Sequence, residues 1–162
     1  MAELTNLETK LGEVIGLAMA AQAATEKVEG LTKDAKLKKQ LKTMRQEAAK
    51  AEKDGTAVAA SIAGKKSKIL AEARTVKTKG ATMMKTYLER GSDDLDGFEF
   101  LTMAEAGEVG HWGVLQELNK QAKHPGVRDL IKVQLPIQKR HLKEVMAASL
   151  MLAAKEDANA PA

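Results

Sequence analysis

The amino-acid sequence predicts an all-α protein, an up-and-down bundle of helices. Hydrophobic residues make up 44% of the 162 positions but aromatic residues only 2%, so Ala, Leu, Val, Ile and Met must supply the core. The 12 glycines and 3 prolines are too few for the many turns of an all-β chain. Apolar residues recur at spacings of three and four, the period of a helix with one buried face. We expect a single helical domain over 1–155 and a frayed tail over 156–162.

The first two predicted helices form a hairpin. Apolar spacing predicts a helix over about 3–29, ended by Gly30. The spacing resumes at Leu37 and predicts a second helix that stops at Asp54-Gly55. The connection over 32–34 is short, so the two helices should be antiparallel.

A long lysine-rich segment and a second hairpin follow. The segment covers about 56–90 and is either one helix or two pieces that meet near Gly80. A break at 91–94 supplies acidic residues suited to a helix N-terminus. The next helix should stop before the His-Pro-Gly turn at 124–126, and the last helix should extend to about 155.

Charge and composition limit the classes of function. The net charge of +4 is uneven, with 18 Lys and Arg against 11 Asp and Glu in residues 1–90 and the opposite bias in the remainder. The lysines are spread around their helices without aromatic residues between them, so we interpret them mainly as a solvated face, with nucleic-acid or other polyanion binding as the weaker alternative. There is no cysteine, no basic leader at the N-terminus and no apolar run near the ~20 residues of a membrane span. We therefore expect a cytoplasmic protein without a membrane partner.

Polar groups interrupt the apolar faces of the last two helices. At ~100° per residue, Glu108 lies at the centre of an apolar face, with Glu105 and His111 at about 60° on either side. His141 lies at the centre of the next helix's apolar face, with Glu144 at about 60° to one side. Two adjacent antiparallel helices thus direct metal-competent groups into one core.

Two interpretations of these groups stay open. Glu108 and His111 form Glu-x-x-His, which lets one helix offer a carboxylate and an imidazole to one ion, and His141 with Glu144 offers the reverse order. Such oxygen and nitrogen donors suit iron, manganese or zinc. The alternative is a buried hydrogen-bonded network of Glu108, His141 and Gln138 that binds no metal.

Residues 91–153, which include Trp112-Gly113-Val114-Leu115, resemble the last two bundle helices of ferritin-like proteins, most closely the stress-linked YciE/YciF-type family. The resemblance implies a four-helix core with a dinuclear iron-type centre, and it puts Glu105, Glu108, His111 and His141 at or near ligand positions. It also implies a role in stress or oxidant handling.

The ligand set is incomplete compared with that family. Gln138 stands where the last Glu-x-x-His needs its carboxylate, and the inner stripes of the first two helices lack ligands. These stripes carry Ala18, Gln22, Met44, Ala48 and Ala51. The expected function is metal binding in the core, with iron or manganese favoured and zinc as a further candidate. The alternative is a metal-free bundle that acts through an unknown protein partner. Self-association is expected in both cases, with a dimer as the favoured form. Whether the protein is an enzyme stays open.

Overall fold

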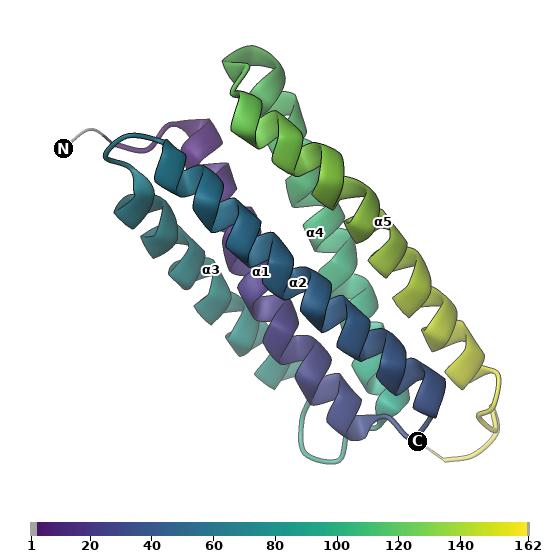
Figure 1. The fold of residues 1–162 in the computed structure, drawn as a ribbon. Helices are drawn as coiled ribbons and strands as arrows, with labels where there is room; N and C mark the ends of the chain where they lie inside the picture. The colour runs from purple at the N-terminus through teal and green to yellow at the C-terminus, as the bar shows by residue number, and fades with distance from the viewer. Residues whose placement is uncertain (1–2, 162) are drawn as a thin grey trace.

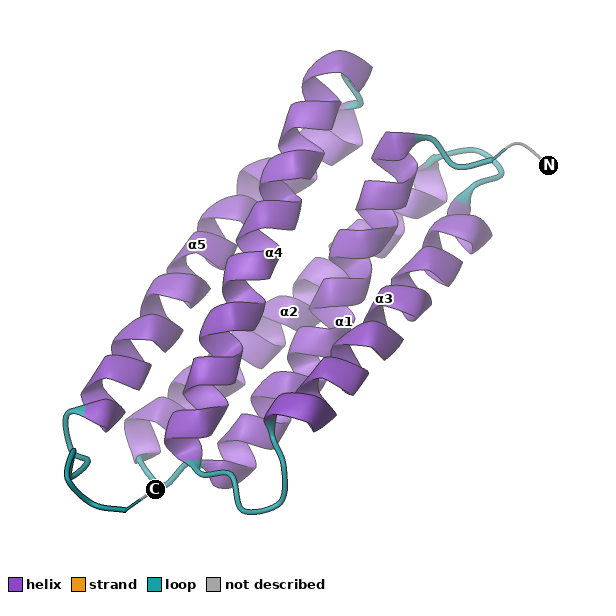
Figure 2. Ribbon diagram, turned by 180° about the vertical axis from the view of Figure 1, so that it is seen from behind, coloured by secondary structure: helices purple, strands orange, loops and turns teal. Residues whose placement is uncertain are grey.

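The computed structural model describes residues 3–161 and is all-helical, as predicted, with no strand among these residues (Figure 2). Consecutive helices are joined by short connections and run antiparallel (Figure 1). The five helices are α1 (Asn6–Leu31), α2 (Ala35–Ser61), α3 (Lys66–Tyr87), α4 (Asp94–Ala122) and α5 (Pro125–Ala153). Within the described range, none of them combines the length and the apolar character needed to cross a membrane.

Helices α1, α2, α4 and α5 form a four-helix bundle, and α3 lies outside it. Helix α1 packs against α2 and α4, and α5 packs against α4 and α2, which closes a ring of four (Figures 1 and 2). Helix α3 packs on the outer side of α1 and barely contacts α4. The close approach of α3 requires glycine, because a Cβ atom at Gly16 would lie 2.3 Å from the carbonyl oxygen of Ala73. Helix α3 is therefore the additional helical segment that the sequence predicts.

The predicted break before α4 and the predicted turn before α5 are both confirmed. Asp93 caps α4 in a capping box with Asp96, and Gly91 has a φ of 100°. Helix α4 ends at Ala122, and His124 caps α5, because its Nδ1 accepts a hydrogen bond of 3.2 Å from the backbone N–H of Val127.

The predicted stop at Asp54-Gly55 is wrong, because α2 continues to Ser61. Gly55 is buried inside the helix, where a Cβ atom would lie 2.7 Å from Cγ1 of Ile15 on α1. Glycine serves close helix packing at this position. The chain turns instead around Gly64, which has a φ of 71°, and α3 then passes through Gly80 without a break. Gly30, the predicted end of the first helix, also lies inside α1.

Two apolar clusters fill the core at different heights along the bundle. The Trp112 cluster contains Leu11, Val14, Ile15, Ala59, Ile69, Ala73, Trp112, Leu115, Val127, Leu130, Ile131 and Leu135. The Phe98 cluster contains Ala24, Val28, Leu37, Leu41, Met44, Leu88, Phe98, Phe100, Leu101, Val145, Ala148 and Leu152. The helix positions between the two clusters are occupied by small and polar residues.

Candidate functional site

The positions between the two apolar clusters hold a polar layer, which we define as Glu47, Glu105, Glu108, Gln138 and His141. The layer draws on α2, α4 and α5. Glu105 is 2% exposed, and Glu108 and His141 are each 3% exposed. The helical-wheel prediction that Glu108 and His141 lie at the centres of apolar faces is therefore confirmed, and Glu105, predicted on the flank, is buried as well.

His141 lies between two carboxylates from different helices. Its Nδ1 is 3.7 Å from Oε2 of Glu105 on α4, and its Nε2 is 3.4 Å from Oε1 of Glu47 on α2. Burial disfavours the charged ring, but the bonding and negative charge of Glu105 and Glu47 outweigh it and raise the pKa of His141 above its ordinary value of 6.5. An imidazolium with an N–H directed at each carboxylate is the form that this arrangement favours.

Glu108 is bonded to an amide and not to a histidine. Nε2 of Gln138 donates a hydrogen bond to Oε2 of Glu108. Burial, and then the negative charge of Glu105, raise the pKa of Glu108 well above its ordinary value of 4.5, although the Gln138 bond opposes the shift. The polar layer thus disfavours a second negative charge beside Glu105.

Two buried polar atoms of this layer have no hydrogen-bond partner. They are Oε2 of Glu105 and Oε1 of Gln138. A buried acceptor without a donor costs about 1–3 kcal/mol. If the Gln138 amide turned over, a protonated Glu108 could donate to Oε1, but Glu105 would still lack a close donor.

His111 is directed away from the polar layer. Its Nδ1 lies 3.0 Å from Oε2 of Glu13 on α1 and 3.3 Å from Nζ of Lys10. Burial alone would raise the pKa of Glu13, but Lys10 and His111 together lower it. The side chain of His111 is 40% exposed, so this ion cluster is at the bundle surface.

Glu144 is also engaged outside the layer. Its two carboxylate oxygens lie 3.2 and 3.3 Å from Nη1 of Arg140. The same arginine donates to Oε2 of Glu47 through its Nη2. Of the five predicted metal ligands, the structure brings Glu105, Glu108 and His141 together and directs His111 and Glu144 to other partners.

Glu47 is a residue of the polar layer that the sequence analysis did not include among the candidate ligands. It lies three residues after the buried Met44, on the flank of the inner stripe of α2, and its side chain remains 22% exposed. The i+3 spacing was the available signal, but only the packing of α2 beside α5 shows that Glu47 reaches His141. Within residues 3–161, no three His, Cys, Asp or Glu side chains are arranged to hold a metal ion as they stand.

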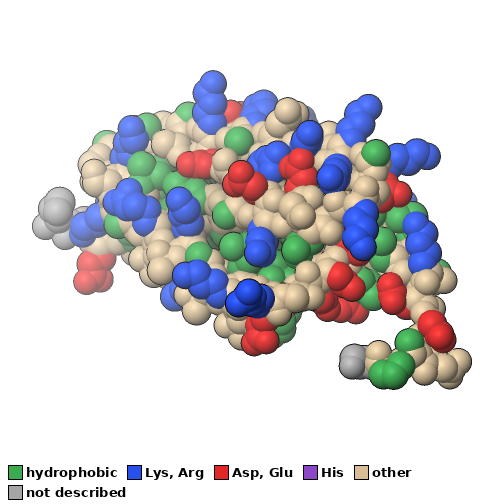
Figure 3. Space-filling view, turned by 90° about the horizontal axis from the view of Figure 1, so that it is seen from below, with side chains coloured by type: hydrophobic (Ala, Val, Ile, Leu, Met, Phe, Trp, Pro, Cys, Tyr) green, Lys and Arg blue, Asp and Glu red, His purple; other side chains and the backbone are tan. Residues whose placement is uncertain are grey.

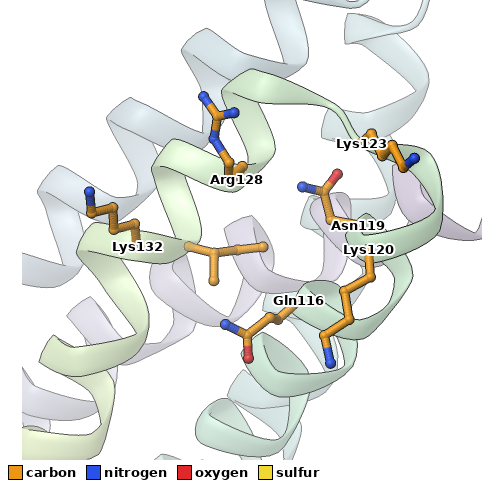
Figure 4. A pocket seen from close by; sticks show the side chains of 7 residues that line it. Gln116, Asn119, Lys120, Lys123, Arg128 and Lys132 are labelled. Atoms are coloured by element: carbon orange, nitrogen blue, oxygen red, sulfur yellow. The ribbon is translucent and has the colours of Figure 1, made fainter.

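A surface hollow of about 620 Å³ lies beside the α4–α5 turn. Its basic lining residues are Lys120, Lys123, Arg128 and Lys132. Figure 4 shows their charged ends pointing to different sides of the hollow and not to a common point. On the face drawn in Figure 3, lysine and arginine are likewise scattered among acidic and apolar side chains. This distribution fits a solvated surface better than a polyanion site.

Comparison with protein-family models, with curated proteins and with solved structures found no match to this chain.

Proposed function

We propose that this chain is a ferritin-like four-helix protein that binds a non-haem metal ion, iron or manganese, at Glu105, Glu108 and His141. The order of the elements supports the fold assignment. One helical hairpin, a long crossover and a second hairpin build the bundle, and ferritin-like folds have one such crossover. The resemblance to the YciE/YciF-type family extends the proposal to stress or oxidant handling in the cytoplasm.

The observation that carries the proposal is the incompletely compensated negative charge in the core, where Glu105 and Glu47 share one histidine, His141. Glu105 is buried, its Oε2 accepts no hydrogen bond, and its charge raises the pKa of the neighbouring Glu108. A buried carboxylate needs a cation or several donors. A metal ion at these two carboxylates would supply that compensation, and oxygen donors with one imidazole suit iron and manganese.

His141 can donate a ring nitrogen to a metal only after it loses a proton. Both of its nitrogens face carboxylates, and its pKa is raised. Metal binding should therefore release protons and weaken as the pH falls. Glu47 can supply a further carboxylate oxygen from α2, in competition with its bond to Arg140. His111 and Glu144 can join only if they leave Glu13 and Arg140.

A second candidate function rests on the contacts that the layer already makes. Gln138 is bonded to Glu108, and His141 lies between Glu105 and Glu47, so the layer can also act as a metal-free network that fixes the helix register. The protein then acts through a protein partner. In that case, chelators leave the melting temperature unchanged.

Elemental analysis and calorimetric titration with Mn(II) and Fe(II) separate the two candidates. The metal proposal expects about one or two bound equivalents, proton release, and a melting temperature that EDTA lowers. Glu108→Ala and His141→Ala should each abolish stoichiometric binding, whereas Glu117→Ala, which removes an exposed carboxylate of the same helix, should not. Full binding in both core variants would overturn this site. Absence of binding in the unaltered protein would leave the metal-free network.

A further inference from the structure

A second cavity reaches the polar layer from the side of α3. It has a volume of about 200 Å³ and lies between α1, α3 and α4. Met83 on α3 and Met103 on α4, which are 46% and 37% exposed, are at its outer wall. Glu105, Glu108 and His111 line it as well, so one side of the cavity is apolar and another carries carboxylates.

The cavity exists because small residues face one another across three helices. Its small lining residues are Ala20, Ala21, Ala24, Gly80, Ala104 and Gly107. At Gly80, α3 approaches α1 so closely that a Cβ atom would lie 2.7 Å from Cβ of Ala20. At Gly107 no heavy atom lies within 4 Å of such a Cβ position, so space stays open on the side of α4.

One buried acceptor of the cavity lining, Oε2 of Glu105, has no hydrogen-bond partner. Glu105 is 2% exposed, and no donor lies within hydrogen-bond distance of its Oε2. The nearest cationic group is Nδ1 of His141, at 3.7 Å, and the charge of this ring is shared with Glu47. His111 is already bonded to Glu13. A ligand that brings a positive charge and N–H donors would therefore satisfy a group that the protein leaves unsatisfied.

The lining also limits the charge, the hydrophobicity and the size of a ligand that fits the cavity. The negative charge of Glu105 and the acceptor oxygens of Glu108 disfavour an anion, and an apolar wall of alanine, glycine and methionine does not stabilise a hydrated metal ion. A hydrocarbon group, in contrast, is stabilised when it buries its surface against the same wall. An apolar cavity of about 150 Å³ is enough for benzene, so this one has room for a ring and a short substituent.

We propose that this cavity binds a small organic ammonium ion, with its apolar part against the small-residue wall and its ammonium group at Glu105 and Glu108. The inference goes beyond the proposed metal function, although the two share these carboxylates. Metal binding requires His141 and not the wall, whereas the organic cation requires the wall and not His141.

Benzylammonium is a suitable probe, with about eight non-hydrogen atoms, and it is titrated into the whole chain in the presence of EDTA. We expect saturable binding by calorimetry, and NMR shifts at the amides of the lining residues Gly80 and Gly107. Benzyl alcohol should bind at least about tenfold more weakly, because it lacks the charge, and benzoate should not bind. Equal affinity for the alcohol, or shifts confined to other residues, would overturn the proposal.

Two pairs of variants test the wall and the charge separately. Ala104→Leu fills the cavity and should abolish binding, whereas Ala57→Leu makes the same change on an exposed face of α2 and should not. Glu105→Gln should weaken binding by about tenfold or more, whereas Glu117→Gln should leave it unchanged. His141→Ala should keep benzylammonium binding while it removes metal binding, so the two proposals can fail independently. Full binding by Ala104→Leu would overturn the inference.

Discussion

The Phe98 cluster and the polar layer occupy neighbouring turns of the same two helices. On α4, Leu101 of the cluster is followed one turn later by Glu105 of the layer. On α5, Val145 of the cluster lies one turn after His141. All four side chains face the core and are almost fully buried. Identical backbone geometry therefore supports two regions that are stabilised by different physical forces.

The stabilising interactions of the two regions differ in how strongly they depend on direction and on pH. Apolar burial is non-directional and does not depend on protonation, so the Phe98 cluster needs only shape and volume. The polar layer depends on which atom carries a proton and on which donor faces it. Shortage of donors, shown by the unpartnered Oε2 of Glu105, is what makes the layer a candidate site.

The largest effect should come from removing apolar volume. Phe98 is fully buried, so Phe98→Ala should lower the free energy of unfolding by about 3–5 kcal/mol. Guanidinium denaturation should give the same loss on both sides of neutral pH, because no titrating group is involved. Val114→Ala, at a position that is 47% exposed, should cost less than about 0.5 kcal/mol. A loss at Phe98 that varied with pH would break the contrast.

A smaller loss of unfolding free energy should follow when side-chain volume is added next to the Trp112 cluster. Gly55→Ala places a Cβ atom 2.7 Å from Ile15, and such overpacking costs about 1–3 kcal/mol. Gly110→Ala is the matched control, because no atom lies within 4 Å of its Cβ position. Alanine there should stabilise α4 by roughly 0.5–1 kcal/mol. Equal effects in the two variants would show that helix propensity, and not close packing, decides at Gly55.

Replacing Glu108 should stabilise the protein only where its carboxyl group would otherwise ionise. The pKa of Glu108 is raised, so the stability that its neutral form contributes is fully present below 4.5 and is lost as the pH rises through the folded-state pKa. Glu108→Gln is permanently neutral and similar in shape. Its melting temperature should exceed that of the parent chain at alkaline pH and match it below 4.5. A constant difference across the pH range would contradict this account.

The smallest effect concerns the titration of His141. Its pKa is raised, so its contribution to stability is present below 6.5 and decreases as the pH rises through the folded-state pKa. An NMR titration of the ring protons should give a midpoint above 6.5 for His141, and Glu105→Gln should lower that midpoint. A midpoint that the variant leaves unchanged would show that Glu105 does not stabilise the imidazolium.

Much of this architecture could be predicted from apolar spacing, because a helix with one buried face repeats its apolar residues at a fixed period. That period is why the all-helical class and the burial of Glu108 and His141 were predicted correctly. The end of α2 was predicted wrongly, because glycine is favoured both in turns and at close contacts between helices, and the sequence does not distinguish the two roles at Gly55. The residue type does not record the distance to Ile15 on another helix.

Local periodicity is enough to place the centre of the inward face of each helix, at Glu108 on α4 and at His141 on α5. It does not separate Glu105 from His111, which flank Glu108 at equal angles although only Glu105 is buried. Tertiary structure decided which side chains meet, because side-chain partners come from helices that are far apart in the chain. Glu47 reaches His141 across 94 residues, and Glu13 contacts His111 across 98. The open cavity beside Glu105 likewise depends on how closely α3 approaches α1. This distance between two helices cannot be predicted from the residue spacing within either helix.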